Sequence, residues 1–220
     1  MTEEEARAWL RSTFDVSRET WERLEGYVAL LLAESKAQNL IAQSTWEHVW
    51  SRHIVDSAQL LALAPPPDSD ADLWVDLGSG AGLPGVVVAI LSGYSVLMIE
   101  TRKKRVEFLE SVIARLGLDN ARVHLGKVER AEISAPARVI SARAYAPMER
   151  LIASAHHLAD FSTIWLLPKG QNHQNELAIA QRLWHCDASV EQSLTASDSA
   201  IVRLAAVRTR KNGRKAGGKA

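Results

Sequence analysis

The sequence predicts an α/β protein in which a helical N-terminal lobe precedes a doubly wound, mostly parallel sheet. Apolar residues recur at helical spacing up to about residue 62. Beyond that point, short apolar runs of strand length alternate with stretches of helix length, a pattern typical of a parallel sheet covered by helices on both faces. With 220 residues, 47% of them hydrophobic, the chain can bury one substantial core.

The predicted helical lobe spans residues 1–67. Thr2 with Glu5, and Ser44 with Glu47, each fit the capping-box pattern, in which two residues satisfy each other's backbone amides at a helix start. The proline run 65–67 removes backbone donors and fixes an extended conformation, so no helix can continue through it. We therefore place the boundary of the lobe at residue 67.

Residues 68–207 are predicted to form a Rossmann-like domain. Buried strands are expected at residues 73–77, 95–99, 122–125, 139–142 and 164–167. Helices are expected at residues 84–91, 106–116, 148–158 and 175–183. The extended stretches 188–194 and 200–209 follow without a helix between them, which predicts a terminal antiparallel hairpin.

Charge is unevenly distributed along the chain. Residues 1–70 hold 6 Lys/Arg against 12 Asp/Glu, whereas residues 71–220 hold 20 against 14. The later part is therefore expected to face an anionic partner. Residues 208–220 are basic and contain no large apolar side chain, so we expect a disordered tail that either contacts a polyanion or only raises solubility.

Signals for export, membrane insertion and metal binding are missing from the sequence. No apolar stretch approaches the roughly 20 residues that a membrane-spanning helix needs, and the acidic start of the chain lacks the pattern of a secretory signal. The single cysteine, Cys186, rules out an intrachain disulfide and a thiolate zinc cluster. We expect a cytoplasmic monomer without membrane contact and without metal.

The first predicted strand ends in a glycine-rich segment, Asp-Leu-Gly-Ser-Gly-Ala-Gly-Leu-Pro-Gly, at residues 76–85. Such glycines let a ligand approach the backbone at the carboxyl end of a parallel sheet. The pattern Gly-x-Gly-x-x-Gly that starts at Gly80, with Glu100 20 residues beyond it, also fits a dinucleotide-binding fingerprint. However, the carboxylate of Asp76 would repel a pyrophosphate and would suit the ammonium and sulfonium charges of S-adenosylmethionine. These residues favour a methyltransferase, with an NAD-dependent oxidoreductase as the alternative.

Four motifs occur in an order that resembles one family. They are Arg52-His53-Ile54-Val55-Asp56-Ser57, the loop at residues 76–85, Ser141-Ala142-Arg143-Ala144 and Leu167-Pro168-Lys169-Gly170-Gln171. Over roughly residues 20–175 the chain resembles the bacterial ribosomal RNA small-subunit methyltransferase G family, formerly called glucose-inhibited division protein B. The resemblance implies a class I S-adenosylmethionine-dependent methyltransferase that methylates N7 of one guanine, at position 527 of 16S ribosomal RNA. It also implies that this RNA, or the small ribosomal subunit, is the partner.

The loop and the resemblance together predict the cofactor contacts. Glu100, at the end of the second strand, would accept hydrogen bonds from the ribose hydroxyls, with an ordinary strand-end acid as the alternative reading. The resemblance implies that Val128 and Glu129 flank the adenine. It assigns Arg143 to the cofactor side, although its charge equally suits an RNA phosphate, and both roles stay open. The full predicted set is Asp76, Gly78, Gly80, Leu83, Glu100, Val128, Glu129 and Arg143.

The candidate contacts to RNA are His53, Arg143 and Lys169. Lys169 follows the fifth predicted strand at the rim of the glycine loop, where a cation can meet an RNA backbone; a solvated lysine is the alternative. Helical spacing places Arg52, Asp56 and part of His53 on one side of a helix. That side either faces the cleft or forms a local ion pair that docks the lobe on the sheet.

Guanine N7 carries an exposed lone pair and no proton at neutral pH. The expected site therefore holds no catalytic nucleophile or general base, and its task is to align donor and acceptor. A non-catalytic RNA-binding protein on the same fold is a third possible function, against which the intact loop with Asp76 and Glu100 argues.

One position departs from the pattern of the family. Many relatives have an acid at the start of the fourth strand, where this chain has Arg138, and we expect that position to lie away from the cleft.

Overall fold

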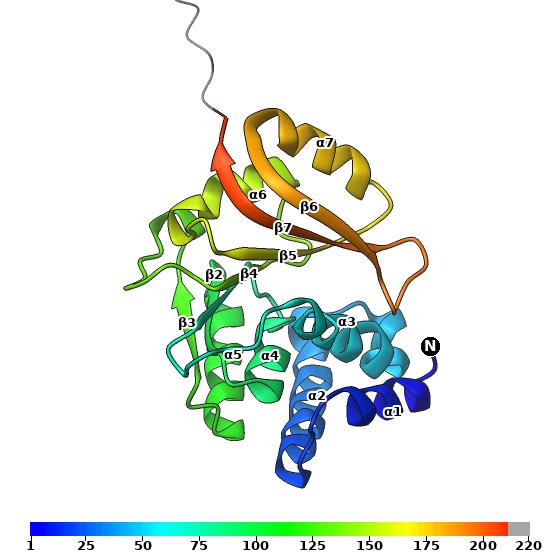
Figure 1. The fold of residues 1–220 in the computed structure, drawn as a ribbon. Coiled ribbons are helices and arrows are strands. Elements are labelled where there is room, and N and C mark those ends of the chain that lie inside the picture. Colours follow the sequence, from blue (N-terminus) through cyan, green and yellow to red (C-terminus); the bar gives the residue numbers. More distant parts are fainter. Residues whose placement is uncertain (211–220) are drawn as a thin grey trace, which may run out of the picture.

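The computed structural model describes residues 1–210, and its centre is a seven-stranded sheet with helices on both faces (Figure 1). The strand order is β3-β2-β1-β4-β5-β7-β6, with parallel pairing from β3 to β5 and antiparallel pairing of β7 with β5 and β6. The strands are β1 (Leu73–Leu77), β2 (Ser95–Glu100), β3 (Ala121–Leu125), β4 (Val139–Ser141), β5 (Ile164–Lys169), β6 (Trp184–Gln192) and β7 (Ala200–Thr209). This confirms the predicted doubly wound, mostly parallel sheet and its terminal hairpin.

Seven α-helices and five 3₁₀ or π-helical segments surround the sheet in the described part of the chain. The α-helices are α1 (Glu3–Thr13), α2 (Arg18–Gln38), α3 (Asp56–Ala58), α4 (Gly85–Leu91), α5 (Lys103–Leu116), α6 (Met148–Ala155) and α7 (His173–Leu183). The other segments are the 3₁₀ turns η1 (Gln43–His48), η3 (Leu61–Leu63), η4 (Val128–Arg130) and η5 (His156–Leu158), and the π-helical segment η2 (Trp50–Val55). None of the helices within residues 1–210 is long and apolar enough to cross a membrane.

The two faces of the sheet belong to two hydrophobic clusters. Successive side chains of a strand point to opposite faces, and accordingly Trp74 belongs to one cluster whereas Val75 belongs to the other. The first cluster holds side chains of α2, α4 and α5, and the second holds those of α6 and α7. Figure 1 shows the same layering, with α4 and α5 on the side of the N-terminal helices and α6 and α7 on the opposite side.

Of the two capping boxes predicted in the N-terminal lobe, one is confirmed and the other is wrong. Thr2 and Glu5 form the predicted capping box at the start of α1. The second predicted box, Ser44 with Glu47, does not form, because residues 43–48 adopt a 3₁₀ turn without a side-chain cap. There the hydroxyl of Thr45 donates to the carbonyl of Ala42 at 2.7 Å, so a side chain within the turn gives this carbonyl a hydrogen-bond partner.

The N-terminal lobe shares its core with the sheet. Leu24, Leu31 and Trp50 are buried in the same cluster as residues of α4 and β2. The fully buried Tyr27 donates its hydroxyl to the backbone carbonyl of Ala81, in the glycine loop, at 2.9 Å. The lobe predicted at residues 1–67 is therefore packed into the domain, and it supports the loop directly.

Arg138 lies at the amino end of β4, away from the carboxyl ends of the strands. Its guanidinium forms ion pairs with Asp68 at 2.8 Å and with Asp72 at 3.4 Å, and it donates to the carbonyl of Pro66 at 3.1 Å. The basic residue at this position is thus matched by acids in the segment that joins the lobe to β1. This agrees with the expectation that the departure from relatives leaves the cleft untouched.

The strand β7 extends past the predicted start of the basic tail at residue 208. Arg208 pairs with His185, and Thr209 pairs with Trp184, across the β6–β7 hairpin. The strand continues because Val207 is buried in the cluster under α6 and α7 and holds the following residues in place. The rest of the predicted tail, residues 211–220, lies outside the described residues.

Replacing Tyr27 by Phe is expected to lower the free energy of unfolding by about 1–2 kcal/mol, because the buried carbonyl of Ala81 loses its partner. Chemical denaturation measures this, with an unchanged slope against denaturant concentration. The matched control is Tyr145→Phe, since the Tyr145 hydroxyl is only half-buried and lies 3.5 Å from Ser154. Equal effects of the two substitutions would contradict the prediction.

Candidate functional site

Two adjoining cavities open at the carboxyl ends of the parallel strands. The chain turns from β1 toward β2 and β3 on one side and toward β4 and β5 on the other, and ligands of open α/β sheets bind at such a point. The first, which we call the glycine-loop cavity, measures about 400 Å³ and is lined by Gly78, Ile99, Glu100, Thr101, Arg102, Arg105, residues 126–129, Ala144 and Tyr145. The second, the β5 cavity, measures about 500 Å³ and is lined by Asp56, residues 143–147, residues 168–170, Glu176, Ser193 and residues 199–201. Ala144 and Tyr145 line both cavities and so separate them.

The glycine loop bends back onto the end of β2. The backbone amides of Gly78 and Ser79 both donate to the carbonyl of Ile99, at 2.8 and 3.1 Å. Gly78 has a φ of +67°, and a Cβ atom at this position would lie 2.5 Å from the ring of Tyr145. Only glycine meets both conditions, because other residues are strained at this φ and would collide with the ring.

Asp76 is completely buried beneath this loop. Its carboxylate accepts hydrogen bonds from Ser141 on β4 at 2.9 Å and from the first amide of α4, that of Gly85, at 3.2 Å. Burial raises the pKa of Asp76 to about 6, although hydrogen bonds from Ser79, Ser141 and Gly85 oppose that rise. The side chain lines neither cavity. Its hydrogen bonds instead connect β1 with β4 and with the start of α4, beneath the glycine loop.

Glu100 lies on the inner wall of the glycine-loop cavity. Its carboxylate accepts from the backbone amides of Thr101 at 2.6 Å, Arg102 at 2.9 Å and Gly80 at 3.0 Å. Burial alone would raise the pKa of Glu100, but these backbone hydrogen bonds outweigh it and the pKa is lowered. The group is therefore a carboxylate at neutral pH, and its longest contact is the ion pair with Arg105 at 3.6 Å.

The predicted cofactor residues do not all reach one place. Gly78, Glu100, Val128 and Glu129 line the glycine-loop cavity, as expected. Gly80 contributes its amide to Glu100 but lines neither of the two cavities, and the side chains of Leu83 and Asp76 are buried behind the loop. Arg143 lines the β5 cavity instead, on the far side of Tyr145.

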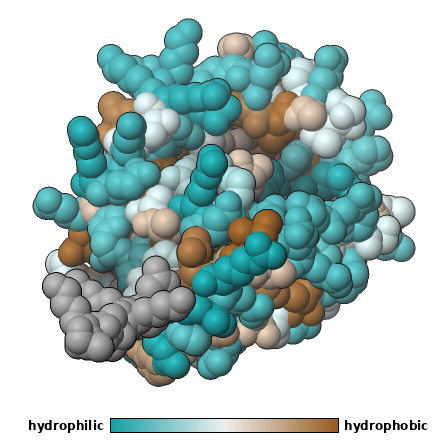
Figure 2. Space-filling view, turned by 90° about the horizontal axis from the view of Figure 1, so that it is seen from above, coloured by the Kyte–Doolittle hydropathy of each residue, from teal (hydrophilic) through white to brown (hydrophobic). Residues whose placement is uncertain are grey.

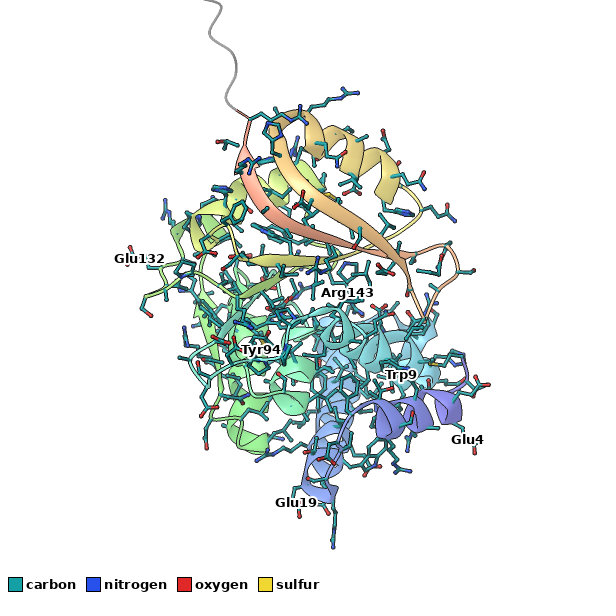
Figure 3. The ribbon with its side chains drawn as sticks, viewed as in Figure 1. Glu4, Trp9, Glu19, Tyr94, Glu132 and Arg143 are labelled. Carbon is teal, nitrogen blue, oxygen red and sulfur yellow. The ribbon has the colours of Figure 1, made fainter. Side chains whose placement is uncertain are left out.

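Arg143 lies where the lobe meets the sheet (Figure 3). Its guanidinium forms an ion pair with Asp56 at 3.0 Å and donates to Nδ1 of His53 at 3.2 Å. The other oxygen of Asp56 accepts from Thr195 at 2.8 Å and from Gln59 at 3.0 Å. Asp56 thereby joins the lobe, the end of β4 and the tip of the β6–β7 hairpin. It lines the β5 cavity, and its partner is Arg143 rather than Arg52, which donates to the carbonyl of Thr195 at 3.3 Å, so the motif, which lies wholly within the described residues, forms no local ion pair.

His53 is buried and orients Arg143. Because a guanidinium can only donate, Nδ1 of His53 must accept, and the ring is neutral with its proton on Nε2. That proton is donated to the hydroxyl of Thr45 at 2.7 Å, and the hydroxyl donates onward to the carbonyl of Ala42. Burial, reinforced by the charge of Arg143, lowers the pKa of His53 to about 4. The ring does not line the β5 cavity, so the structure does not bring this candidate RNA contact to its surface.

Lys169 lines the β5 cavity, but its charge is already paired. Its ammonium donates to Glu176 and to the carbonyl of Ala146, both at 2.8 Å, and only 11% of the side chain is exposed. Glu176 also accepts from the first amide of α6, that of Met148, at 3.0 Å. The lysine therefore holds the segment between β4 and α6 in place, rather than standing as a free cation at the rim.

Three residues of the site were not singled out from the sequence. Tyr145 and Glu176 line the cavities, and Thr195 is the hairpin residue that contacts Asp56. Tyr145 follows the Ser-Ala-Arg-Ala motif directly, which is a usable signal. Thr195 lies far along the chain from Asp56, and only the return of the β6–β7 hairpin brings it here. Glu176 is seven residues from Lys169, but its contact with Met148 depends on the packing of α7 on α6.

Solved structures of other proteins share the fold of this chain. A SAM-dependent methyltransferase from Aquifex aeolicus aligns with a TM-score of 0.58 and 13% identity over 78% of this chain and 97% of that chain. The glycopeptide N-methyltransferase MtfA complexed with S-adenosyl-L-methionine aligns with a TM-score of 0.56 and 10% identity over 70% of this chain and 93% of that chain. The chain thus has the fold of S-adenosylmethionine-dependent methyltransferases, as predicted.

Sequence similarity identifies the family. The model of the family described as rRNA small subunit methyltransferase G matches residues 20–204. Ribosomal RNA small subunit methyltransferase G from Sphingopyxis alaskensis is 48% identical over 200 residues, covering 91% of this chain and 84% of that protein. The protein of the same name from Zymomonas mobilis is 44% identical over 207 residues, covering 92% of this chain and 93% of that protein. The chain belongs to the rRNA small subunit methyltransferase G family, which confirms the resemblance.

The neutral His53 predicts a specific dependence of stability on pH. The unfolded chain binds a proton at His53 near pH 6.5, whereas the folded protein binds it only near pH 4. Between these values the unfolded state holds more protons, so the contribution of His53 to stability falls as the pH drops. The loss amounts to roughly 2 kcal/mol at pH 5 relative to pH 7.5.

Urea denaturation of the wild type and of His53→Gln across this pH range tests the assignment. A glutamine can accept from Arg143 and donate to Thr45, but it does not titrate. The difference in unfolding free energy between the two proteins should therefore shift in favour of the variant as the pH falls from 6.5 to 5. A difference that stays constant with pH would contradict a buried neutral His53.

Proposed function

We propose that this chain transfers the methyl group of S-adenosylmethionine to N7 of one guanine in small-subunit ribosomal RNA. The observation that carries the proposal is the pair of cavities that meet at Tyr145, at the switch point of a methyltransferase sheet. A two-substrate reaction needs two such sites that adjoin, because the reacting atoms must approach to about 3–3.5 Å. Membership in the family supports both the donor and the class of acceptor.

The glycine-loop cavity fits the cofactor. Its carboxylate, Glu100, can accept hydrogen bonds from ribose hydroxyls once Arg105, its most distant partner at 3.6 Å, gives way. Beside it, the side chains of Ile99 and Val128 are buried and apolar, which suits a purine ring. When bound, S-adenosylmethionine supplies an electrophilic methyl group on a sulfonium. We assign Asp76 and Gly80 to the support of this cavity, since neither lines it.

The environment of Asp76 argues against the dinucleotide alternative. Dinucleotides place their pyrophosphate at the amides that begin the helix after the glycine loop. Here the first of these amides, that of Gly85, is bonded to the Asp76 carboxylate. A pyrophosphate would have to replace a buried hydrogen bond and lie beside a carboxylate, so we do not favour an NAD-dependent enzyme.

The β5 cavity is the proposed place of the acceptor base. Guanine N7 has its own lone pair, so no side chain has to act as a nucleophile or a base, and the four charged groups of this cavity are all ion-paired. Cys186, the single thiol, lies on β6 outside both cavities, and burial raises its pKa. A base reaches such a pocket from a single-stranded loop, in which bases can turn outward.

The expected partner is 16S ribosomal RNA or the assembling small subunit, with the enzyme acting as a cytoplasmic monomer. The face that carries α7 and the β6–β7 hairpin is mostly hydrophilic, and its hydrophobic residues lie in separate small groups (Figure 2). Such a surface suits a polar partner better than an apolar one. Residues 208–220 would add affinity for RNA through phosphate contacts.

Deleting the gene should remove one 7-methylguanosine from small-subunit RNA, and restoring the gene should bring it back. Mass spectrometry of digested RNA measures this, and it tests the methylated atom and the RNA substrate together. Retention of the full amount of 7-methylguanosine in the deletion strain would overturn the proposal.

Purified protein provides the control for the cofactor. S-adenosylmethionine should raise the melting temperature of the wild type, whereas NAD should leave it unchanged, because only a ligand that binds the folded state stabilises it. Glu100→Gln should reduce this shift, and the matched substitution Glu110→Gln, at an exposed position on α5, should not.

A further inference from the structure

The carboxylate of Glu176, a residue that lines the β5 cavity, uses only one of its two oxygens within the described part of the chain. One oxygen, Oε2, accepts from both the Met148 amide, at 3.0 Å, and the Lys169 ammonium, at 2.8 Å. Within residues 1–210, no hydrogen bond to the other oxygen, Oε1, is formed. The side chain is 23% exposed, and it borders the cavity. The contacts to Lys169 and Met148 fix the group in position, so Oε1 is a pre-positioned hydrogen-bond acceptor.

The shape of guanine places two donors opposite the atom to be methylated. If N7 faces the glycine-loop cavity, the N1–H and the N2 amino group lie on the far edge of the base, inside the β5 cavity. A carboxylate is the natural acceptor for these donors, since it has no proton of its own to present. Adenine shows an acceptor at N1, which a carboxylate repels. The same oxygen therefore attracts guanine and rejects adenine.

We propose that Glu176 is a specificity-determining residue that accepts hydrogen bonds from N1–H and the N2 amino group of the acceptor guanine. The inference rests on the proposed function and deepens it. Methylation at N7 leaves a positive charge on the purine, which makes N1–H a stronger donor. The contact to the carboxylate thus strengthens as the bond to N7 forms, and it favours the transition state over the ground state.

Glu176 also has a structural role, because it caps α6 and pairs with Lys169. The substitution Glu176→Gln separates the two roles. The amide oxygen of glutamine can still accept from Met148 and Lys169, so the fold is expected to persist. Its amide nitrogen would replace the free oxygen Oε1 and would present hydrogens to the hydrogens of guanine.

The test uses small-subunit RNA with either guanine or inosine at the acceptor position, offered both as free RNA and as assembled subunit. Inosine keeps N7 and N1–H but lacks the N2 amino group. The wild type should methylate guanine RNA with a kcat/KM about tenfold or more above that of inosine RNA, as for the loss of one hydrogen bond to a charged group. Glu176→Gln should lose at least about tenfold on guanine RNA and should discriminate far less between the two bases.

The control Glu110→Gln changes the net charge equally at an exposed site and should behave as the wild type. The melting-temperature shift with S-adenosylmethionine should be the same in Glu176→Gln, because that residue lies outside the glycine-loop cavity. The inference is overturned if wild-type protein shows no preference for guanine over inosine, a result that needs no variant. It is equally overturned if Glu176→Gln retains the wild-type preference. Failure of the wild type to methylate guanine RNA at all would refute the proposed function itself.

Discussion

The ion pair between Arg143 and Asp56 is the contact on which the arrangement of both cavities depends. Asp56 comes from the helical lobe, Arg143 from the end of β4, and Thr195 adds the tip of the β6–β7 hairpin. Little of either charged side chain is exposed, 23% and 17%, so removal of one partner would leave a charge poorly compensated. The neutral ring of His53 then fixes the guanidinium from a second side. Because Arg143 is followed by Ala144 and Tyr145, which line both cavities, this junction also positions the wall between the cavities.

Buried or paired carboxylates hold each part of the site in place. Asp76 joins β1, β4 and α4 below the glycine loop, Glu100 closes the loop on β2, and Glu176 joins α6 to β5 through Lys169. Such pairing makes the site rigid before any ligand arrives, which suits a reaction whose main requirement is alignment. The two cations of the β5 cavity, Arg143 and Lys169, are already paired with carboxylates. Affinity for RNA phosphates therefore has to come from cations elsewhere on the surface.

Much of this could be predicted from the sequence, because the signals are local. The five parallel strands, the hairpin and the glycine loop follow from apolar runs and turn residues, and the bounds of β1 agree residue for residue. The prediction of a capping box at Ser44 was wrong, because these residues form a 3₁₀ turn in which the hydroxyl of Thr45 bonds to the carbonyl of Ala42. The roles of Asp76 and Lys169 could not be predicted in the same way. Motif spacing places a residue near a site, but it does not show whether the charge of that residue is already paired within the protein. Glu176 lies in no recognised motif, and its contact with the start of α6 depends on the packing of α7 on α6.

The most direct test of this account is a double-mutant cycle on Asp56 and Arg143, measured as unfolding free energy for Asp56→Asn, Arg143→Gln and the double variant. If the pair joins the lobe to the sheet, each single substitution destabilises the protein. The double variant should then be more stable than the sum of the two effects predicts, by about 1–3 kcal/mol. Strictly additive effects would mean that the two charges do not stabilise each other, and would contradict the central place given to this ion pair.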